Sequence, residues 1–371
     1  MAQRQSVSSD ETYEVRVAEP PDYGRFLALY EDVWERPRGE VWFDWRFVDD
    51  PYSEDVEMVV AEREGTLVGA ELLLPMPLDV GSERVVARQP VDWIVHPDHR
   101  RRGIFTRMTE LLLSTYGERT DLLFNFPTDE LLPGLEKFDW TTVSRQSTRY
   151  RIHDPRAVTK NPAVADSPAV GLVTRFGAPA IRAGLAAADV LTPTATDVSV
   201  ERVDGPATDA VHTVYDETRP DDIHVPRETA FVEWRFDNPR WDTTTYVARQ
   251  AGRPVSTVVV ATAAKPHATV GYLLDVQPMT TIPERAPAFA AALDAALADM
   301  DVDAVQAPTD PYPAVLQRRG FLSDDNPLLS RFSTPTTHVV KSLRAPESAD
   351  FERDVFDGEE WLLMLGDRDI E

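Results

Sequence analysis

Cysteine is absent from the 371 residues, which excludes disulfides, thiolate catalysis and cysteine-bound zinc. The chain also has no run of about 18 apolar residues, so we expect no membrane-spanning helix. Its first residues are polar and lack the apolar core of a signal peptide. These absences predict a cytoplasmic protein that binds neither a metal nor a membrane.

Lysine is rare, because only four of the 38 basic residues are lysines. The formal net charge is −25, with acidic residues spread over the whole chain. Such a surface repels phosphate backbones, so we expect no nucleic-acid partner. Lysine depletion with dispersed acids is typical of a halophilic protein from a cytoplasm at molar salt, where the Debye length shrinks to roughly 3 Å. The lysines are Lys137, Lys160, Lys265 and Lys341.

The N-terminal third alternates between helical and strand-like patterns. Apolar residues recur at Phe26, Leu29, Tyr30 and Val33, the spacing of an amphipathic helix. Strands are predicted at residues 13–18, 56–63, 67–75, 85–95 and 122–126, and further helices at 103–116 and 131–138. The order of helix, antiparallel strands, helix, strand and helix predicts an α+β fold.

The second half repeats the first. The segment from Phe43 to Phe47 resembles that from Val232 to Phe236, so that Trp45-Arg46 corresponds to Trp234-Arg235 at an offset of 189 residues. Other matches follow in the same order, which predicts two tandem copies of one fold, each a mixed, mostly antiparallel twisted sheet flanked by helices. The expected parts are an N-terminal domain at 12–152, a helical linker at 153–198, a degenerate second domain at 199–345 and a tail at 346–371, with 361–371 expected to add an edge strand.

The segment from Val91 to Thr106 carries the chemistry. A predicted strand ends at Val95, and a helix begins near Gly103 after the three arginines Arg100, Arg101 and Arg102. A helix N-terminus presents free N–H groups and the positive end of the helix dipole, and a glycine there lets a phosphate approach the backbone. In so acidic a protein, this arrangement predicts a binding site for a phosphorylated ligand.

This segment resembles motif A of the GNAT superfamily of N-acetyltransferases, whose pattern is Arg/Gln-x-x-Gly-x-Gly/Ala. The sequence from Arg100 to Phe105 departs from it only at Phe105, where the family has a small residue. The likeness covers about residues 13–150, and more weakly 201–331. The turn also resembles that of tandem acetyltransferases related to the mycobacterial enhanced-intracellular-survival protein.

The resemblance implies that acetyl-CoA is the co-substrate. It implies that the segment from Arg100 to Thr106 holds the pyrophosphate and that the backbone of Ile94 and Val95 pairs with the pantetheine arm. The predicted cofactor-binding residues are therefore Ile94, Val95, Arg100, Arg101, Arg102, Gly103, Ile104, Phe105 and Thr106. In the second copy the arginines and glycine become Thr281, Ile282, Pro283 and Glu284, so that copy is not expected to bind CoA.

The superfamily's reaction is direct attack of an amine on the thioester, assisted by a base and by a backbone N–H, which we expect near Val95. Asp92 is the first candidate for the base and Glu71, within an apolar strand, is the second. Asn125 is a candidate for binding pantetheine or the acceptor. The tyrosine that often protonates the thiolate in this family is replaced by Leu135.

The acceptor is expected to be a small-molecule or protein amine, and the chain could form a homo-oligomer. Two alternative functions stay open. One is a non-catalytic CoA-binding or scaffold protein, which the missing tyrosine favours. The other is an aminoacyl or peptidyl transferase of the tandem-GNAT type, which the net charge of −25 disfavours because its donor is transfer RNA.

Overall fold

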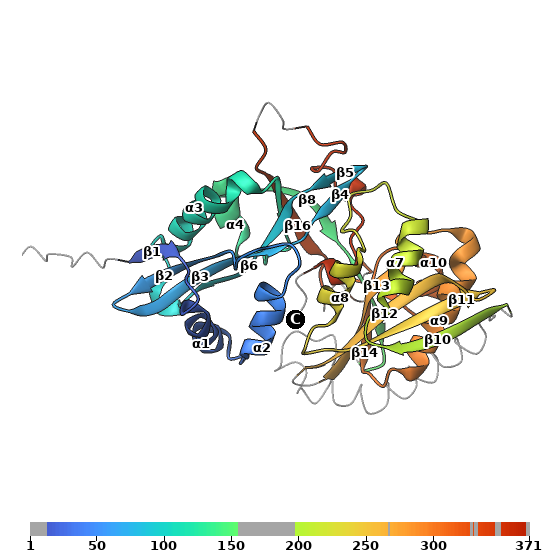
Figure 1. Ribbon diagram of the computed structural model, residues 1–371. Coiled ribbons are helices and arrows are strands. Elements are labelled where there is room, and N and C mark those ends of the chain that lie inside the picture. Colours follow the sequence, from blue (N-terminus) through green and yellow to red (C-terminus); the bar gives the residue numbers. More distant parts are fainter. Residues whose placement is uncertain are drawn as a thin grey trace, which may run out of the picture.

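The structure is a computed structural model that describes residues 13–154, 197–265, 268–326, 329, 333–345 and 350–368. Its two main bodies are seven-stranded sheets with the same strand pattern (Figure 1). In the first sheet the strand order is β1-β2-β3-β6-β7-β16-β8, and only the β6–β7 pair is parallel. The strands are β1 (Glu14–Val17), β2 (Met58–Arg63), β3 (Thr66–Pro75), β6 (Ala87–Val95), β7 (Leu122–Asn125), β16 (Thr336–Ser342) and β8 (Thr141–Gln146).

The second sheet has the order β10-β11-β12-β13-β14-β9-β15, again with one parallel pair, β13–β14. This matching order confirms the predicted fold class of two mixed, mostly antiparallel sheets. The strands are β10 (Val198–Asp204), β11 (Asp242–Gln250), β12 (Arg253–Lys265), β13 (Ala268–Gln277), β14 (Ala304–Pro308), β9 (Thr148–Ile152) and β15 (Leu322–Ser323).

The two sheets exchange strands across the predicted boundary between the domains. Strand β9, expected in the N-terminal domain, pairs between β14 and β15 of the second sheet. Strand β16, expected in the second domain, pairs between β7 and β8 of the first. Each sheet is therefore completed by the other half of the chain. The helical linker predicted within 153–198 lies almost entirely outside the described residues.

Helices cover both faces of each sheet (Figure 1). In the first half α1 and α2 lie on one face and α3 and α4 on the other. Helix α1 carries the predicted apolar stripe, since Phe26, Leu29 and Tyr30 are buried. The helices are α1 (Asp22–Trp34), α2 (Glu40–Phe43), α3 (Ile104–Tyr116), α4 (Leu132–Leu135), α7 (Thr208–Glu217), α8 (Thr229–Phe236), α9 (Ala286–Asp299) and α10 (Pro313–Arg318).

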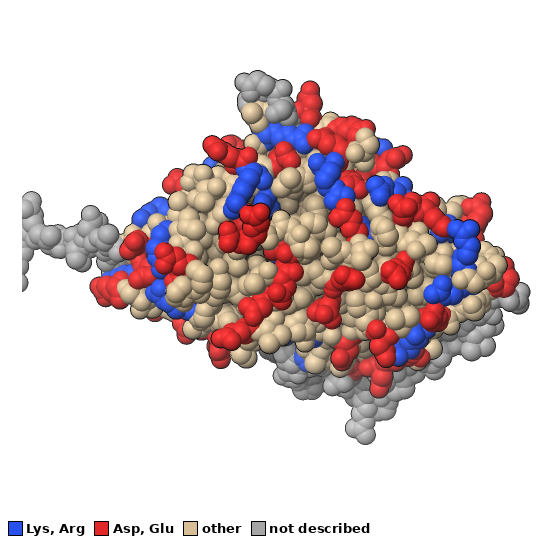
Figure 2. All heavy atoms as spheres, in the orientation of Figure 1, with Lys and Arg blue, Asp and Glu red and all other residues tan. Residues whose placement is uncertain are grey.

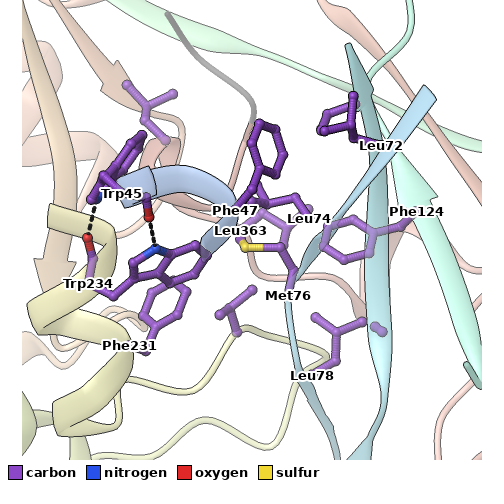
Figure 3. Close-up of a cluster of buried hydrophobic side chains, with 14 of the residues drawn as sticks. Trp45, Phe47, Leu72, Leu74, Met76, Leu78, Phe124, Phe231, Trp234 and Leu363 are labelled. Carbon is purple, nitrogen blue, oxygen red and sulfur yellow. Dashed lines mark hydrogen bonds between the residues drawn. The ribbon is translucent and has the colours of Figure 1, made fainter. Parts of the chain in front are cut away.

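One apolar core runs through the junction of the two halves (Figure 3). It joins Phe47 and Met76 of the first half to Phe231 of the second and Leu363 of the C-terminal segment. The hairpin of β4 (Leu78–Val80) and β5 (Glu83–Val85) extends this contact, because the backbones of Asp79 and His224 exchange two hydrogen bonds. A continuous core of this kind holds the two sheets in a fixed relation.

The C-terminal segment lies buried between the two sheets, so the expectation that it adds an edge strand is wrong. Arg227 forms a buried ion pair with Asp367, and the side chain of Gln89 on β6 donates to the Asp367 carbonyl at 2.6 Å. Arg235 donates to the carbonyls of Gly366 and Arg368. Polar side chains from both halves thus form hydrogen bonds with the backbone carbonyls of this segment, which allows it to be buried between the sheets.

Acidic side chains are scattered over the visible face of both halves, with basic ones between them (Figure 2). Arginine forms most of the ion pairs among the described residues, as with Arg16 and Arg25, which share Asp22 and Glu62. No helix in the described part of the chain is long and apolar enough to cross a membrane.

Candidate functional site

A cleft of about 690 Å³ opens between the end of β6, the start of α3 and the α4 region. Its position follows from the local sequence, since β6 ends at Val95 and α3 begins at Ile104, with the arginine-rich turn between them. The residues that line it are Trp34, Trp93, Val95, His99, Arg100, Arg101, Gly103, Ile104, Phe105, Thr106, Thr128, Glu130, Leu131 and Lys137.

The turn before α3 has two residues in the left-handed region, Arg101 with φ 62° and Gly103 with φ 75°. No side chain caps the start of α3, and its first turn holds no acidic residue. The free N–H groups of this turn therefore face an anion-binding position, and Arg100 and Arg101 line the same cleft. A glycine at 103 suits the positive φ, which a side chain would strain.

Two histidines fix this turn against the rest of the domain. The His99 Nδ1 atom lies 3.0 Å from the Tyr13 hydroxyl oxygen, and His96 Nε2 lies 3.0 Å from an Asp32 carboxylate oxygen. Burial and the neighbouring His96 lower the pKa of His99. Both histidines thus act as turn residues that position the arginines.

Strands β6 and β7 pair only at Ala87–Leu122 and Arg88–Leu123 and then diverge. Beyond that point this edge of β6 faces the gap that the cleft enters. Asn125 closes the inner end of the gap, because its side-chain amide donates to the Pro90 carbonyl at 2.5 Å and its Oδ1 accepts from Phe126 N at 2.7 Å. The Asn125 side chain thus spans the gap and takes the place of a direct backbone hydrogen bond between the two strands.

A β-bulge interrupts β6 at the inner end of the cleft. Ala70 pairs with Ile94 and Leu72 with Val91, so two residues of β6, Asp92 and Trp93, oppose the single residue Glu71 of β3. Asp92 takes a φ of 51°, a strained value for a residue other than glycine. The bulge lies three residues before Val95, where the carbonyl-polarising N–H was expected.

The bulge directs the side chains of its two residues to opposite faces of the sheet. Asp92 faces the α1–α2 side, where one carboxylate oxygen lies 3.5 Å from Nε of the buried Arg46. Trp93 faces the α3 side and lines the cleft. The buried Arg46 is therefore paired with an acidic side chain in the first half.

Glu71 lies on the α3 side of the sheet and is 1% exposed. Thr109 of α3 donates a 3.0 Å hydrogen bond to its carboxylate. Burial raises the pKa of Glu71 to about 7, although hydrogen bonding by Thr109 and Trp93 opposes this rise. An enclosed carboxylate of this kind has no direct path to an acceptor amine.

The structure brings most of the predicted cofactor-binding residues together. Of that set, Val95, Arg100, Arg101, Gly103, Ile104, Phe105 and Thr106 line the cleft. Two do not: the Ile94 side chain is buried in the core, and Arg102 points away with a 3.5 Å contact to the Asp98 carbonyl. Sequence reasoning missed Trp93, although the apolar run Trp93-Ile94-Val95 breaks strand alternation and signals a bulge.

The second copy differs at the same place. A proline-containing 3₁₀ turn (Pro283–Arg285) precedes α9, and Thr281 Oγ1 accepts a 2.9 Å hydrogen bond from the backbone N of Tyr312. The Tyr312 ring stacks on Phe289 of α9 with centroids 4.8 Å apart. Aromatic packing thus ties the start of α10 to α9, and no arginine triplet precedes the helix.

Comparison with known families agrees with this geometry. The acetyltransferase (GNAT) domain family matches residues 14–143. These residues, which include β6, the arginine-rich turn and α3, therefore match a GNAT domain. A comparison with curated protein sequences found no match.

Solved structures share the fold over both halves. A GCN5-related N-acetyltransferase from Anabaena variabilis is 12% identical with a TM-score of 0.60, covering 90% of this chain and 73% of its own. A probable N-acyltransferase from Enterococcus faecalis is 10% identical with a TM-score of 0.62, covering 90% and 72%. Eis1 from Mycobacterium abscessus is 15% identical with a TM-score of 0.52, covering 90% and 74%.

Proposed function

We propose that the cleft binds acetyl-CoA and that the protein transfers the acetyl group to an amine. The observation that carries this proposal is the uncapped N-terminus of α3, preceded by exposed arginines, at the mouth of a gap between diverging strands. The turn supplies N–H donors and fixed positive charge for a pyrophosphate. In a protein of net charge −25, such a turn is suited to a strongly anionic ligand.

The pantetheine arm would lie in the gap between β6 and β7. Its amides would pair with the edge of β6 near Ile94 and Val95, as an added strand does. The Asn125 side chain spans the space between the strands and bonds to the Pro90 carbonyl, so the two backbones do not pair directly there. This arm carries the thioester from the pyrophosphate turn to the bulge.

The bulge would be the reaction centre. Its backbone N–H groups would polarise the thioester carbonyl while the amine nitrogen bonds to the carbonyl carbon and the carbon–sulfur bond breaks. We assign Asp92 the task of orienting the amine and accepting its proton, because its carboxylate lies at the bulge on the α1–α2 side of the sheet, from which the amine would approach. Arg46 Nε lies 3.5 Å from that carboxylate and holds it in place. The thiolate takes a proton from water, since Leu135 is buried and carries no acid.

Buried Leu135 at the position of the family's tyrosine also favours a second candidate, a protein that binds CoA without turnover. The two candidates share the donor site and differ only in acyl transfer. Release of free thiol in the presence of a panel of amines separates them.

The first experiment is a calorimetric titration with acetyl-CoA in 2 M KCl. We compare the wild type with Gly103→Glu, which places a carboxylate at the proposed pyrophosphate position. Gly205→Glu is the matched control, because Gly205 also has a positive φ and has no atom within 4 Å of an added Cβ. One site per chain, lost in Gly103→Glu and kept in Gly205→Glu, supports the proposal. No binding by folded wild type would overturn it.

A further inference from the structure

The inner wall of the cleft is aromatic at the bulge. The Trp93 ring contacts Phe105 of α3 edge-on at 5.9 Å and Trp140 at 6.4 Å. Behind these rings lies the apolar core on the α3 face, which includes Leu135 and Ile104. Trp93 therefore separates the cleft from a hydrophobic interior.

A buried carboxylate lies directly behind Trp93. Glu71 opposes the bulge, and the enclosed Trp93 indole N–H contributes to lowering the pKa of its carboxyl. Within the part of the chain that the structure describes, Thr109 on α3 donates to Glu71 and Val59 on β2 pairs with it, and neither of these side chains is ionisable near neutral pH. A buried carboxylate such as that of Glu71 costs folding free energy in apolar surroundings. Its presence behind Trp93 therefore calls for a functional explanation.

We infer that Trp93 restricts the site to short acyl groups and that Glu71 is the positioning residue that holds its indole. The inference rests on the proposed function, because it takes the bulge as the place of the thioester. An acetyl group fits beside the indole, whereas a longer alkyl chain would have to enter the space that the ring fills. The aromatic contacts with Phe105 and Trp140 keep the ring from turning aside.

Removal of the ring should change the preference for the acyl group. Trp93→Ala opens a space beside the apolar rings of Phe105 and Trp140, with Glu71 at its back, and these rings offer an alkyl chain an apolar surface. Each methylene buried there adds about fourfold in affinity. We therefore expect hexanoyl-CoA to bind the wild type at least tenfold more weakly than acetyl-CoA, and Trp93→Ala to abolish or reverse that ratio.

The binding measurement uses CoA, acetyl-CoA and hexanoyl-CoA by calorimetry in 2 M KCl, and needs no acceptor. Trp93→Phe is measured beside Trp93→Ala, because the smaller change keeps an aromatic ring and preserves the fold more readily. We expect the preference for acetyl-CoA to fall in the order wild type, Trp93→Phe, Trp93→Ala, with affinity for CoA within about twofold throughout. Trp241→Ala, which removes a partly buried tryptophan outside the cleft, should keep the wild-type ratio.

The role of Glu71 is tested by the same ratio between pH 6 and 8.5. The ionised carboxylate holds the indole N–H more strongly than the neutral acid, so the preference for acetyl-CoA should rise severalfold with pH in the wild type. Glu71→Gln keeps an acceptor but loses the charge, and should give a flat profile. Asp50→Asn, which removes another buried carboxylate that does not line the cleft, should keep the wild-type profile.

The outcomes separate this inference from the proposed function. A wild type that binds none of the three ligands would overturn both. A wild type that binds acetyl-CoA, with an unchanged acyl ratio in Trp93→Ala and Trp93→Phe, would overturn the role of Trp93 and leave the donor site intact. A changed ratio in the Trp93 variants with the same pH profile in Glu71→Gln and wild type would overturn the positioning role of Glu71.

Discussion

Trp45 and Trp234 exchange two hydrogen bonds across the junction of the halves, each indole N–H donating to the backbone carbonyl of the other at 2.7 Å (Figure 3). The two residues occupy matching positions in two similar sequence segments, 189 residues apart. Their reciprocal contact is what a pseudo-twofold relation between two copies produces. This pair is structural, which agrees with its presence in the half that lacks the arginine turn.

The first prediction concerns this pair. Trp45→Phe or Trp234→Phe removes one buried hydrogen bond from an indole N–H to a backbone carbonyl, so each should lower the free energy of unfolding by about 0.5–1.5 kcal/mol. The double variant should lose less than the sum of the two, because the residues are in contact. Urea unfolding in 2 M KCl measures all three. Strictly additive losses would mean that the two bonds are independent.

The second prediction follows from the strand exchange. A fragment of residues 1–152 lacks β16, which lies between β7 and β8, so β8 has no neighbour with which to pair. We expect this fragment to be unfolded or aggregated by circular dichroism and proteolysis. Co-expression with residues 153–371 should restore a folded complex, since that fragment carries β16. Cooperative unfolding of the isolated fragment would contradict the exchange.

The third prediction concerns Asp92. Asp92→Asn keeps the shape of the side chain but cannot accept a proton, so amine-dependent release of thiol should fall about 10- to 100-fold. The affinity for acetyl-CoA should stay the same, because the carboxylate faces the other side of the sheet from the cleft. Asp299→Asn in the second half, where the carboxylate accepts from Tyr246, is the control and should keep full activity. Equal activity of both variants would exclude Asp92 as the base.

Much of the first domain could be predicted from the sequence because its signals are local. The apolar periodicity of α1, the strand alternation and the arginine triplet before Gly103 each lie within a short window, and the structure places the helix, the strands and the turn there. The arginine-rich turn that lines the cleft could be located in the sequence for the same reason.

What could not be predicted depends on contacts between distant segments. Strands β8 and β9 are separated by Ser147 alone, and nothing in residues 141–152 indicates that they join different sheets. The burial of the C-terminal segment likewise depends on Arg227, Arg235 and Gln89, which lie far away in the chain. Glu71 was interpreted as a base because its sequence neighbours do not show that α3 encloses it.

The fourth prediction gives Glu71 a measurable effect on stability. Its folded-state pKa of about 7 lies above the ordinary value of 4.5, so the folded protein binds more protons than the unfolded chain between these values. The free energy of unfolding should therefore decrease as pH rises from about 4.5 to 7. Glu71→Gln removes this cost and should be more stable than the wild type by up to about 3 kcal/mol at pH 8, with no such gain at pH 4.5. Urea unfolding at both pH values tests this, and a gain independent of pH would contradict it.

The fifth prediction concerns salt. The net charge of −25 is spread over the surface, as the visible face shows (Figure 2), so the folded state is strained by repulsion that ions screen. We propose that the protein is halophilic and expect its melting temperature to rise between 0.1 and 2 M KCl. Glycerol is the control, because it stabilises folded proteins without screening charge. Glycerol added at 0.1 M KCl should therefore not reproduce the rise in melting temperature that 2 M KCl gives. A melting temperature that is equal at both salt concentrations would mean that the surface acids are balanced locally by arginine pairs such as Arg16–Asp22, and that the acidity is no adaptation to salt.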